Sequence, residues 1–470
     1  MKRKFKIILA AVLCSVFALC AFTACDFFAS APDGNTPYDV AVDNGYHGSM
    51  DNWLAGGEGG TASAKNWYDS YLQAVQAGEF TGTFPEFLAA VGDGSSAATQ
   101  ALRSVVSVYA VGASSHSAGA GVIYSLDAQT GNAFIITNYH VVYHTATGEI
   151  DNHIVVYLYG NETYPDFNPE TSGAIDAYYV GGSMSSDIAV LYVEGSDALK
   201  DENGFARAAV AANSDAVSVG ESVFAAGNPL GRGLSVSRGV VSVEREEISA
   251  TAADGRTPVV LPEIRIDAAV NHGNSGGGLF NARGELVGIV NARLDSVKDG
   301  AGVEDSVAGF GYALPSNFAL AVAESIIDGI VYRTDGTIDF SKPSSATRAV
   351  LGLEYAILSS QTVFNEETCK FYKQEQIVVK STLQIGGAGA VAGLRNGDTL
   401  VSAKIVHPQR EGQSAPQEER TVSITRIHKL SDFLINVRKN DTVLFTVSRG
   451  GETKEFSALF SSTQHFVKLA

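Results

Sequence analysis

The most constraining feature of this sequence is a run of short apolar segments, separated by Gly-rich turns, that begins near Ala101. No crossover helix is indicated between the segments, so the pattern predicts antiparallel β structure closed into a barrel or a pair of barrels. The segments are residues 102–111, 121–124, 134–137, 154–159, 177–180, 188–193, 223–226, 236–243, 264–270, 286–290 and 310–313. After Pro315, apolar residues at helical spacing predict a helix that closes the domain.

One serine stands in a Gly-rich turn between two of these predicted strands. The turn reads Asn271-His272-Gly273-Asn274-Ser275-Gly276-Gly277. Such a turn lets the Ser275 hydroxyl project while neighbouring backbone N–H groups point at whatever lies above it, which is how an oxyanion hole is made. We therefore predict an oxyanion turn over Gly273, Asn274 and Ser275.

A nucleophilic serine needs a base, and two upstream residues fit that role. His140 follows the apolar run 134–137, and Asp187 directly precedes the run 188–193. The order His140, Asp187, Ser275 is that of the chymotrypsin-type triad and differs from the subtilisin and α/β-hydrolase orders. Taken singly, a glycine-flanked serine is usually only a turn, and a histidine beside a strand is usually a core residue.

Four motifs together resemble the HtrA/Deg family of trypsin-like serine proteases. They are TNYHVV around His140, SSDIAVLYV around Asp187, GNPLG at 227–231 and GNSGG around Ser275. The resemblance covers roughly residues 100–330 and implies an all-β protease domain of two antiparallel barrels. It also implies a serine endopeptidase of unfolded or damaged proteins that needs no metal or other cofactor. His272 and Gly278 depart from the residues most frequent in the family.

The resemblance also implies where the specificity pocket lies. Ala269 falls at the position of the pocket base, and residues 289–293 form one wall. Because Ala269 is not acidic, selection of Lys or Arg is not expected. With Val270 beside it, the pocket should be small and apolar. Arg293 would select acidic residues if its side chain turned inward, whereas as a rim residue with its head in water it would have little effect.

Two other functions remain open from the residues alone. His140 and His144 are four residues apart, a spacing that would place both on one face of a helix as zinc ligands, although no Glu follows His140 as in H-E-x-x-H. The second alternative is a non-catalytic protease-fold module that binds misfolded chains or acts as a chaperone.

The N-terminal part of the chain predicts export and anchoring. A basic start and a short apolar run predict a signal peptide over residues 1–24, and Cys25 resembles the lipidated cysteine of a bacterial lipobox. Residues 25–97 are predicted to be a tether with a degenerate 33-residue repeat, set by Gly45 and Gly78. That repeat is interpreted as a partly ordered linker or as a contact for a surface or a homotrimer.

The C-terminal part predicts a second, smaller domain. The protease domain is expected over residues 98–332 and a polar linker over residues 333–348. Residues 349–460 resemble a small α+β PDZ-like domain, which would bind a peptide C-terminus as an added strand. The resemblance assigns the carboxylate-holding turn to Val350, Leu351, Gly352 and Leu353, and residues 406–419 are a polar departure from a compact PDZ domain.

Charge and cysteine content complete the expectation. The chain has 470 residues and a net charge of −18, with no basic stripe beyond its first residues, which argues against binding to nucleic acid. After removal of the signal segment and lipidation of Cys25, only Cys369 would remain, so no disulfide framework is expected. We therefore expect an extracytoplasmic, membrane-anchored lipoprotein at the cell surface or in the periplasm.

Overall fold

The computed structural model describes residues 95–470 apart from 113–115, 152, 163–172, 201–204, 294–295, 299–303, 307–308, 367–369, 409–419 and 470. The predicted signal peptide, Cys25 and the repeat of the tether lie outside the described residues. Among the residues that are described, no helix is both long and apolar enough to cross a membrane.

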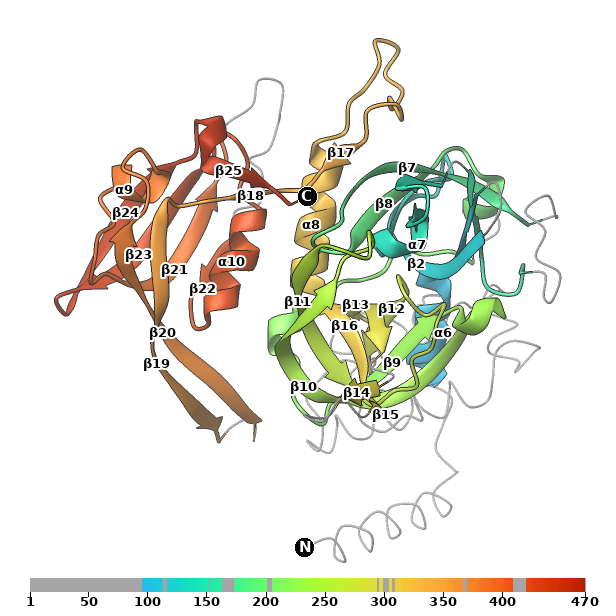
Figure 1. Ribbon diagram of the computed structural model, residues 1–470, viewed down its shortest axis with the longest axis horizontal. Helices are drawn as coiled ribbons and strands as arrows, with labels where there is room; N and C mark the ends of the chain where they lie inside the picture. The colour runs from blue at the N-terminus through green and yellow to red at the C-terminus, as the bar shows by residue number, and fades with distance from the viewer. Residues whose placement is uncertain are drawn as a thin grey trace, which may run out of the picture. The chain divides into compact units, whose positions relative to one another are not determined.

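The first half of the protease region is a ring of antiparallel strands. The strand order is β17-β7-β6-β1-β2-β3-β8, and pairing between β7 and β8 closes six of these strands on themselves (Figure 1). The elements are α6 (Ser95–Ser104), β1 (Val105–Val111), β2 (His116–Asp127), β3 (Asn132–Thr137), α7 (Tyr139–Val142), β4 (Tyr143–His144), β5 (Glu149–Ile150), β6 (His153–Tyr157), β7 (Ile175–Ser183), β8 (Ile188–Val193) and the 3-10 turn η2 (Asp197–Leu199).

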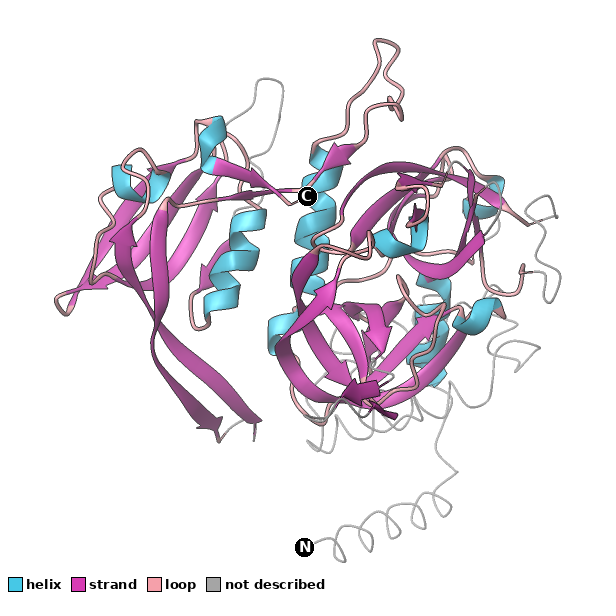
Figure 2. Ribbon diagram, in the orientation of Figure 1, coloured by secondary structure: helices cyan, strands magenta, loops and turns pink. Residues whose placement is uncertain are grey.

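The second half is a closed six-stranded barrel. Its strands follow the order β10-β11-β16-β13-β12-β9, and Figure 2 shows them encircling a common interior. The elements are η4 (Ser214–Ala216), β9 (Ser222–Gly227), η5 (Pro229–Gly231), β10 (Ser235–Thr251), β11 (Pro258–Ile266), β12 (Gly278–Asn281), β13 (Leu286–Arg293), β14 (Ser296–Lys298), β15 (Glu304–Ser306), β16 (Gly311–Pro315) and α8 (Ser316–Asp328). This architecture confirms the predicted all-β, chymotrypsin-like protease domain.

Each barrel has its own buried core, and a third core fills the space between them. Val106, Ile135 and Leu191 belong to the first interior, and Ile264 and Val290 to the second. The third core includes residues from both barrels together with the inner face of α8. Strands buried on both sides therefore read as continuous apolar runs, as β8 does.

Several predicted strands begin or end at other residues than expected, and two of them show the physical reason. The segment 102–111 was predicted as one strand, but α6 continues to Ser104, and its Ala97 and Ala101, four residues apart, lie on the buried side. The segment 264–270 leaves the sheet at Ile266, where Asp267 turns its carboxylate to accept the backbone N–H of Val240 at 2.6 Å.

The predicted linker is in part ordered on the first barrel. Ser344 and Ser345 form β17 (Ser344–Ser345), which pairs in parallel with β7, and Phe340 stacks on Tyr178 with ring centroids 4.7 Å apart. An aromatic side chain in a polar stretch can thus stack on a neighbouring sheet, which the polar composition of the segment does not indicate.

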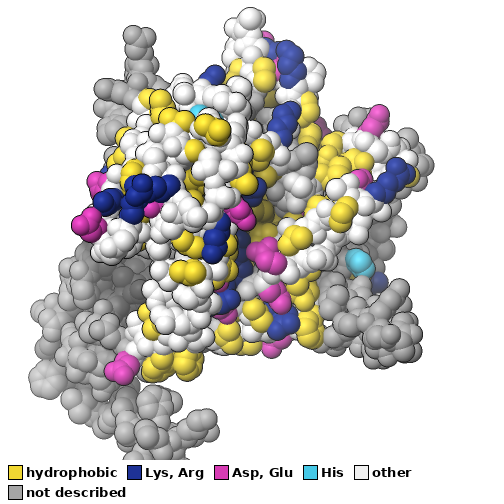
Figure 3. Space-filling model, turned by 60° about the vertical axis from the view of Figure 1, so that its left-hand side comes forward, with side chains coloured by type: hydrophobic (Ala, Val, Ile, Leu, Met, Phe, Trp, Pro, Cys, Tyr) yellow, Lys and Arg dark blue, Asp and Glu magenta, His cyan; other side chains and the backbone are white. Residues whose placement is uncertain are grey.

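The C-terminal region forms a separate mixed α and β unit with its own core. Its sheet has the order β19-β20-β21-β23-β24, with β22 paired to β21, and β18 pairs separately with β25. The elements are β18 (Thr347–Ala349), β19 (Leu353–Asn365), β20 (Lys370–Thr382), α9 (Ala388–Val391), β21 (Thr399–Val406), β22 (Thr421–Ser423), α10 (Ile427–Ile435), β23 (Thr442–Arg449), β24 (Glu452–Leu459), η6 (Thr463–His465) and β25 (Phe466–Lys468). On the face shown in Figure 3, basic and acidic side chains are interspersed.

Candidate active site

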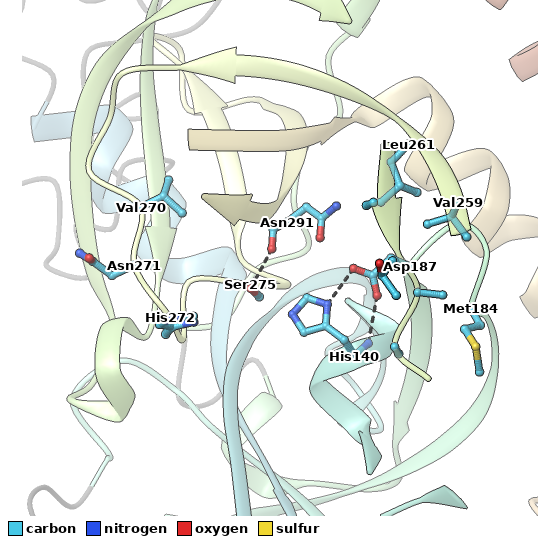
Figure 4. A pocket seen from close by; sticks show the side chains of 14 residues that line it. His140, Met184, Asp187, Val259, Leu261, Val270, Asn271, His272, Ser275 and Asn291 are labelled. Atoms are coloured by element: carbon cyan, nitrogen blue, oxygen red, sulfur yellow. Dashed lines mark hydrogen bonds and ion pairs between the residues drawn. The ribbon is translucent and has the colours of Figure 1, made fainter. Parts of the chain in front are cut away.

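His140, Asp187 and Ser275 line one cavity of about 380 Å³. Figure 4 shows the His140 ring between the Asp187 carboxylate and the turn that carries Ser275. The other lining residues are Met184, Ala250, Thr251, Ala252, Ala253, Val259, Leu261, Val270, Asn271, His272 and Asn291. His140 and Ser275, which are 135 positions apart in the chain, therefore line the same site, as the predicted triad requires.

Asp187 holds His140 by two contacts. Asp187 Oδ2 lies 2.7 Å from His140 Nδ1, and Asp187 Oδ1 accepts the backbone N–H of His140 at 3.0 Å. Asp187 sits in the turn between β7 and β8 with φ of 50°, a left-handed conformation that costs a residue with a side chain about 1 kcal/mol or more. The Asn138 side chain donates to the Asp187 carbonyl at 2.9 Å and helps to hold this turn.

The pKa of His140 is raised above its ordinary value. Burial by itself favours the neutral ring, but the charge of Asp187 and its hydrogen bond to Nδ1 outweigh burial and favour the charged ring. The side chain is 39% exposed, so solvent moderates the effect of burial. An imidazole in this position can accept a proton and be stabilised as the cation by Asp187.

The turn that carries Ser275 is held by hydrogen bonds to both barrels. Ala120 of β2 donates its N–H to the Ser275 carbonyl at 2.8 Å, and Gly276 donates to Val290 of β13 at 2.8 Å. Gly273 and Gly276 have φ of 94° and 84°, which L side chains rarely adopt. The Ser275 hydroxyl donates to the Asn291 carbonyl at 2.8 Å and makes no hydrogen bond to His140 among the described contacts.

The backbone N–H groups of the turn differ in whether they already have a hydrogen-bond acceptor. Within the described part of the chain, the N–H groups of Gly273 and Ser275 have no protein acceptor, as an oxyanion hole requires. The N–H of Asn274 donates to the Asn271 carbonyl at 3.0 Å. Asn274 belongs to the predicted oxyanion turn, but its N–H is not available to an oxyanion, because the tight turn already uses it.

Comparison with known proteins agrees with this geometry. Residues 119–289 match the trypsin-like peptidase domain family. The serine protease Do-like HtrA of Lactococcus lactis subsp. cremoris (strain MG1363) is 29% identical over 340 residues, which cover 72% of this chain and 69% of that protein. Over these residues the chain is similar to HtrA-type serine proteases with a trypsin-like peptidase domain. It is a serine endopeptidase.

Two further relatives extend the comparison. The serine protease Do-like HtrA of Bacillus subtilis (strain 168) is 34% identical over 212 residues, which cover 44% of this chain and 39% of that protein. A probable periplasmic serine endoprotease DegP-like of Brucella suis biovar 1 (strain 1330) is 27% identical over 326 residues. That match covers 68% of this chain and 52% of the Brucella protein.

Only some of the residues predicted to form the specificity pocket line the cavity. Val270 lines the cavity, as does Asn291 of the predicted wall. Ala269 is exposed and is not among the lining residues, and its carbonyl accepts from Ser237 Oγ at 2.8 Å. Strand β11 ends at Ile266, and the exposed Ala269 beyond it does not form the base of this cavity. The side chain of Arg293 lies outside the described part of the structure.

The zinc alternative does not fit the geometry. Helix α7 ends at Val142, so His144 stands on β4 and its ring Nδ1 lies 3.2 Å from Thr147 Oγ1. The described residues contain no group of three or more His, Cys, Asp or Glu side chains placed to hold a metal ion. His140 instead has Asp187 as the partner of its Nδ1 atom.

Two site elements were missed by sequence reasoning. The hairpin of β10 and β11 contributes Ala250–Ala253, Val259 and Leu261 to the cavity wall. Glu263 on β11 is 2% exposed and accepts from the Asn291 side chain at 2.6 Å behind the site. One signal was available, because Glu263 is an acid inside the apolar run that leads to Ile264 and Ile266.

The predicted peptide-binding turn precedes an edge strand. Strand β19 pairs only with β20, so its other edge has no strand partner within the described sheet. Leu351 and Leu353 are buried, and Gly352 has φ of 68°. The N–H of Val350 donates to the His465 carbonyl at 2.8 Å, so Val350 cannot offer it to a carboxylate as predicted.

Proposed function

We propose that this chain is an extracytoplasmic HtrA-type endopeptidase that cleaves unfolded or damaged polypeptides with His140, Asp187 and Ser275. The observation that carries the proposal is the 2.7 Å contact between His140 Nδ1 and Asp187 Oδ2 in the cavity that Ser275 also lines. A base oriented by a carboxylate beside a serine on a Gly-rich turn is the arrangement used for acyl transfer.

In the proposed reaction, Ser275 Oγ attacks the peptide carbonyl and His140 Nε2 takes its proton. Asp187 keeps the proton of the ring on Nδ1 and stabilises the charged imidazole. The N–H groups of Gly273 and Ser275 stabilise the oxyanion, and His140 then gives its proton to the leaving amine. Water repeats these steps on the acyl-enzyme and restores the Ser275 hydroxyl.

The Ser275 hydroxyl must change partner before it can react. In the structure it donates to the Asn291 carbonyl at 2.8 Å, whereas attack requires it to donate to His140. A rotation of the side chain about χ1 exchanges these partners, and side-chain rotations of this kind take picoseconds to nanoseconds in exposed residues. The bond to Asn291 therefore describes a resting conformation of the nucleophile.

Hydrolysis of denatured casein tests this proposal. Ser275→Ala should abolish cleavage, because loss of a triad nucleophile costs on the order of 10⁶ in turnover in subtilisin. Ser249→Ala, which changes an exposed serine on β10, is the matched control and should cleave normally. Cleavage by Ser275→Ala at the wild-type rate would rule out the assignment and favour the non-catalytic binding module.

We further propose that the C-terminal unit binds peptide C-termini as an added strand on β19. The edge of β19 that has no strand partner within the described sheet, and the turn over Leu351, Gly352 and Leu353, support this. Fluorescence anisotropy with a labelled apolar peptide tests it, with the C-terminally amidated peptide as control. Equal affinity for the acid and the amide would contradict carboxylate recognition by this turn.

A further inference from the structure

A buried carboxylate lies behind the proposed nucleophile. Glu263 on β11 is 2% exposed, and its Oε1 accepts a hydrogen bond from Asn291 Nδ2 at 2.6 Å. Asn291 is also buried, at 5% exposed. The second carboxylate oxygen, Oε2, is buried without a hydrogen-bond partner among the described residues. Burying an acid with one short hydrogen bond and one unpaired oxygen lowers the stability of the fold. A buried group of this kind therefore calls for an explanation.

The partner of Glu263 is the residue that receives the Ser275 hydroxyl. The register between β13 and β16 shifts between Val290 and Ala292, so Asn291 is the extra residue of a bulge. A bulged residue is released from the regular ladder, and bulges often re-aim groups beside active sites. Asn291 uses this freedom in two directions, because its carbonyl accepts from Ser275 Oγ at 2.8 Å and its amide donates to Glu263.

The surroundings favour the neutral form of the acid. Burial raises the pKa of Glu263 well above its ordinary value, the hydrogen bond from Asn291 opposes this, and the charge of Asp187 raises it further. The charged groups that act on Glu263 from β10 are Arg245, which favours ionisation, and Glu246, which opposes it. Tyr312 of β16 also interacts with Glu263. Arg245 is itself ion-paired with Asp432 at 2.9 Å.

We propose that Glu263 is a positioning residue of this protease, which holds Asn291 and its bulge in place so that the Asn291 carbonyl keeps Ser275 Oγ in one resting position, from which it turns to His140. This inference rests on the proposed role of Ser275. Glu263 does not touch the substrate or the reacting atoms and acts only through Asn291. Without its anchor, Asn291 would leave an unpaired amide in the core, and the bulge would settle in more than one conformation.

The test compares Glu263→Gln with Glu263→Ala in the full chain, with steady-state hydrolysis of a casein-derived peptide as the readout. Gln keeps the acceptor for Asn291 and cannot ionise, so kcat should stay within about twofold of wild type. Ala removes the acceptor, so kcat should fall about tenfold with KM nearly unchanged, because a nucleophile that is misplaced by a fraction of an ångström loses rate. Glu247→Gln, an exposed acid on β10, is the control and should match wild type.

Two readouts separate positioning from a structural role. Asn291→Ala should reproduce the kcat loss of Glu263→Ala, and the double variant should lose no more than either single variant, because both break the same contact. Glu263→Gln should regain the kcat that Glu263→Ala loses, because the amide oxygen of Gln still accepts from Asn291 Nδ2.

The outcomes also separate this inference from the proposed function. A wild-type chain that does not cleave would overturn both. An active wild type whose Glu263→Ala variant keeps its kcat would overturn the positioning role alone. If Glu263→Ala does not fold, Asn291→Ala decides, because an unchanged kcat in that variant would equally overturn the role.

Discussion

Replacing Gly276 by Ala tests how tightly the turn beside Ser275 is packed. A Cβ atom on Gly276 would lie well inside van der Waals contact of the Ala120 carbonyl oxygen and Thr137 Oγ1, with Asn138 N at 3.1 Å. Gly220 is the matched control, because it has the same φ of 84° but no atom within 4 Å of the added Cβ. The pair therefore separates backbone strain from steric overlap.

The expected losses of unfolding free energy follow from these two environments. Left-handed backbone costs a residue with a Cβ about 1–2 kcal/mol, and the less flexible unfolded chain returns about 0.4–1 kcal/mol. Gly220→Ala should thus cost about 1 kcal/mol. Gly276→Ala adds an overpacking cost of about 1–3 kcal/mol, since the overlapped atoms include backbone. The losses correspond to about 3 °C and roughly 10 °C in Tm for a domain of this size.

The same overlap should move the nucleophile. To relieve it, the turn must shift away from β2, and a displacement of about 1 Å can cost about 100-fold in rate. Thermal unfolding is measured in a Ser275→Ala background, which prevents self-cleavage. Activity is measured separately, as the rate at which a fluorophosphonate labels Ser275. Gly220→Ala should label at the wild-type rate.

Equal losses of stability in the two variants would refute the reasoning. They would mean that the contact of the turn with Ala120 and Thr137 does not constrain it, and that only the backbone conformation matters. Wild-type labelling of Gly276→Ala would likewise show that the turn adapts without moving Ser275.

Three further predictions concern pH, specificity and anchoring. Proteolysis should fall as the pH drops through a value above the ordinary histidine pKa, because the pKa of His140 is raised and only the neutral ring accepts a proton. A midpoint of the pH profile below the ordinary histidine pKa would contradict this. The stabilisation from the ion pair with Asp187 has the opposite dependence, being complete at pH values below the unfolded-state pKa and lost as the pH rises through the folded-state value. Cut sites in denatured casein should carry aliphatic residues on the acyl side, since Val270 lines the cavity, and should change little in Arg293→Ala; a preference for acidic residues that this variant removes would reverse the assignment. Fatty-acid labelling should mark the wild-type chain and not Cys25→Ser, and equal labelling of both would remove the lipid anchor.

The sequence alone was enough to predict the barrels, and it predicted His140, Asp187 and Ser275 as one group. Short apolar segments without crossover helices leave few folds open, and the order of three residue types with a Gly-rich turn is specific. These signals are local, because each motif spans only a few neighbouring residues. The polar stretch 333–348 lacked such a signal, since the stacking of Phe340 on Tyr178 depends on a sheet formed elsewhere in the chain.

Only the tertiary structure decided which groups of the site are already occupied. The N–H of Asn274 is used within its own turn, Ala269 faces outward, and the Ser275 hydroxyl rests on Asn291. Glu263 and Asn291 are 28 residues apart, and neither belongs to a motif. Their contact exists because a bulge in β13 turns Asn291 toward β11, where burial and the nearby Asp187 determine the charge of the acid. Hydrogen-bond partners and burial depend on packing between distant strands, and for that reason the motifs could not indicate them.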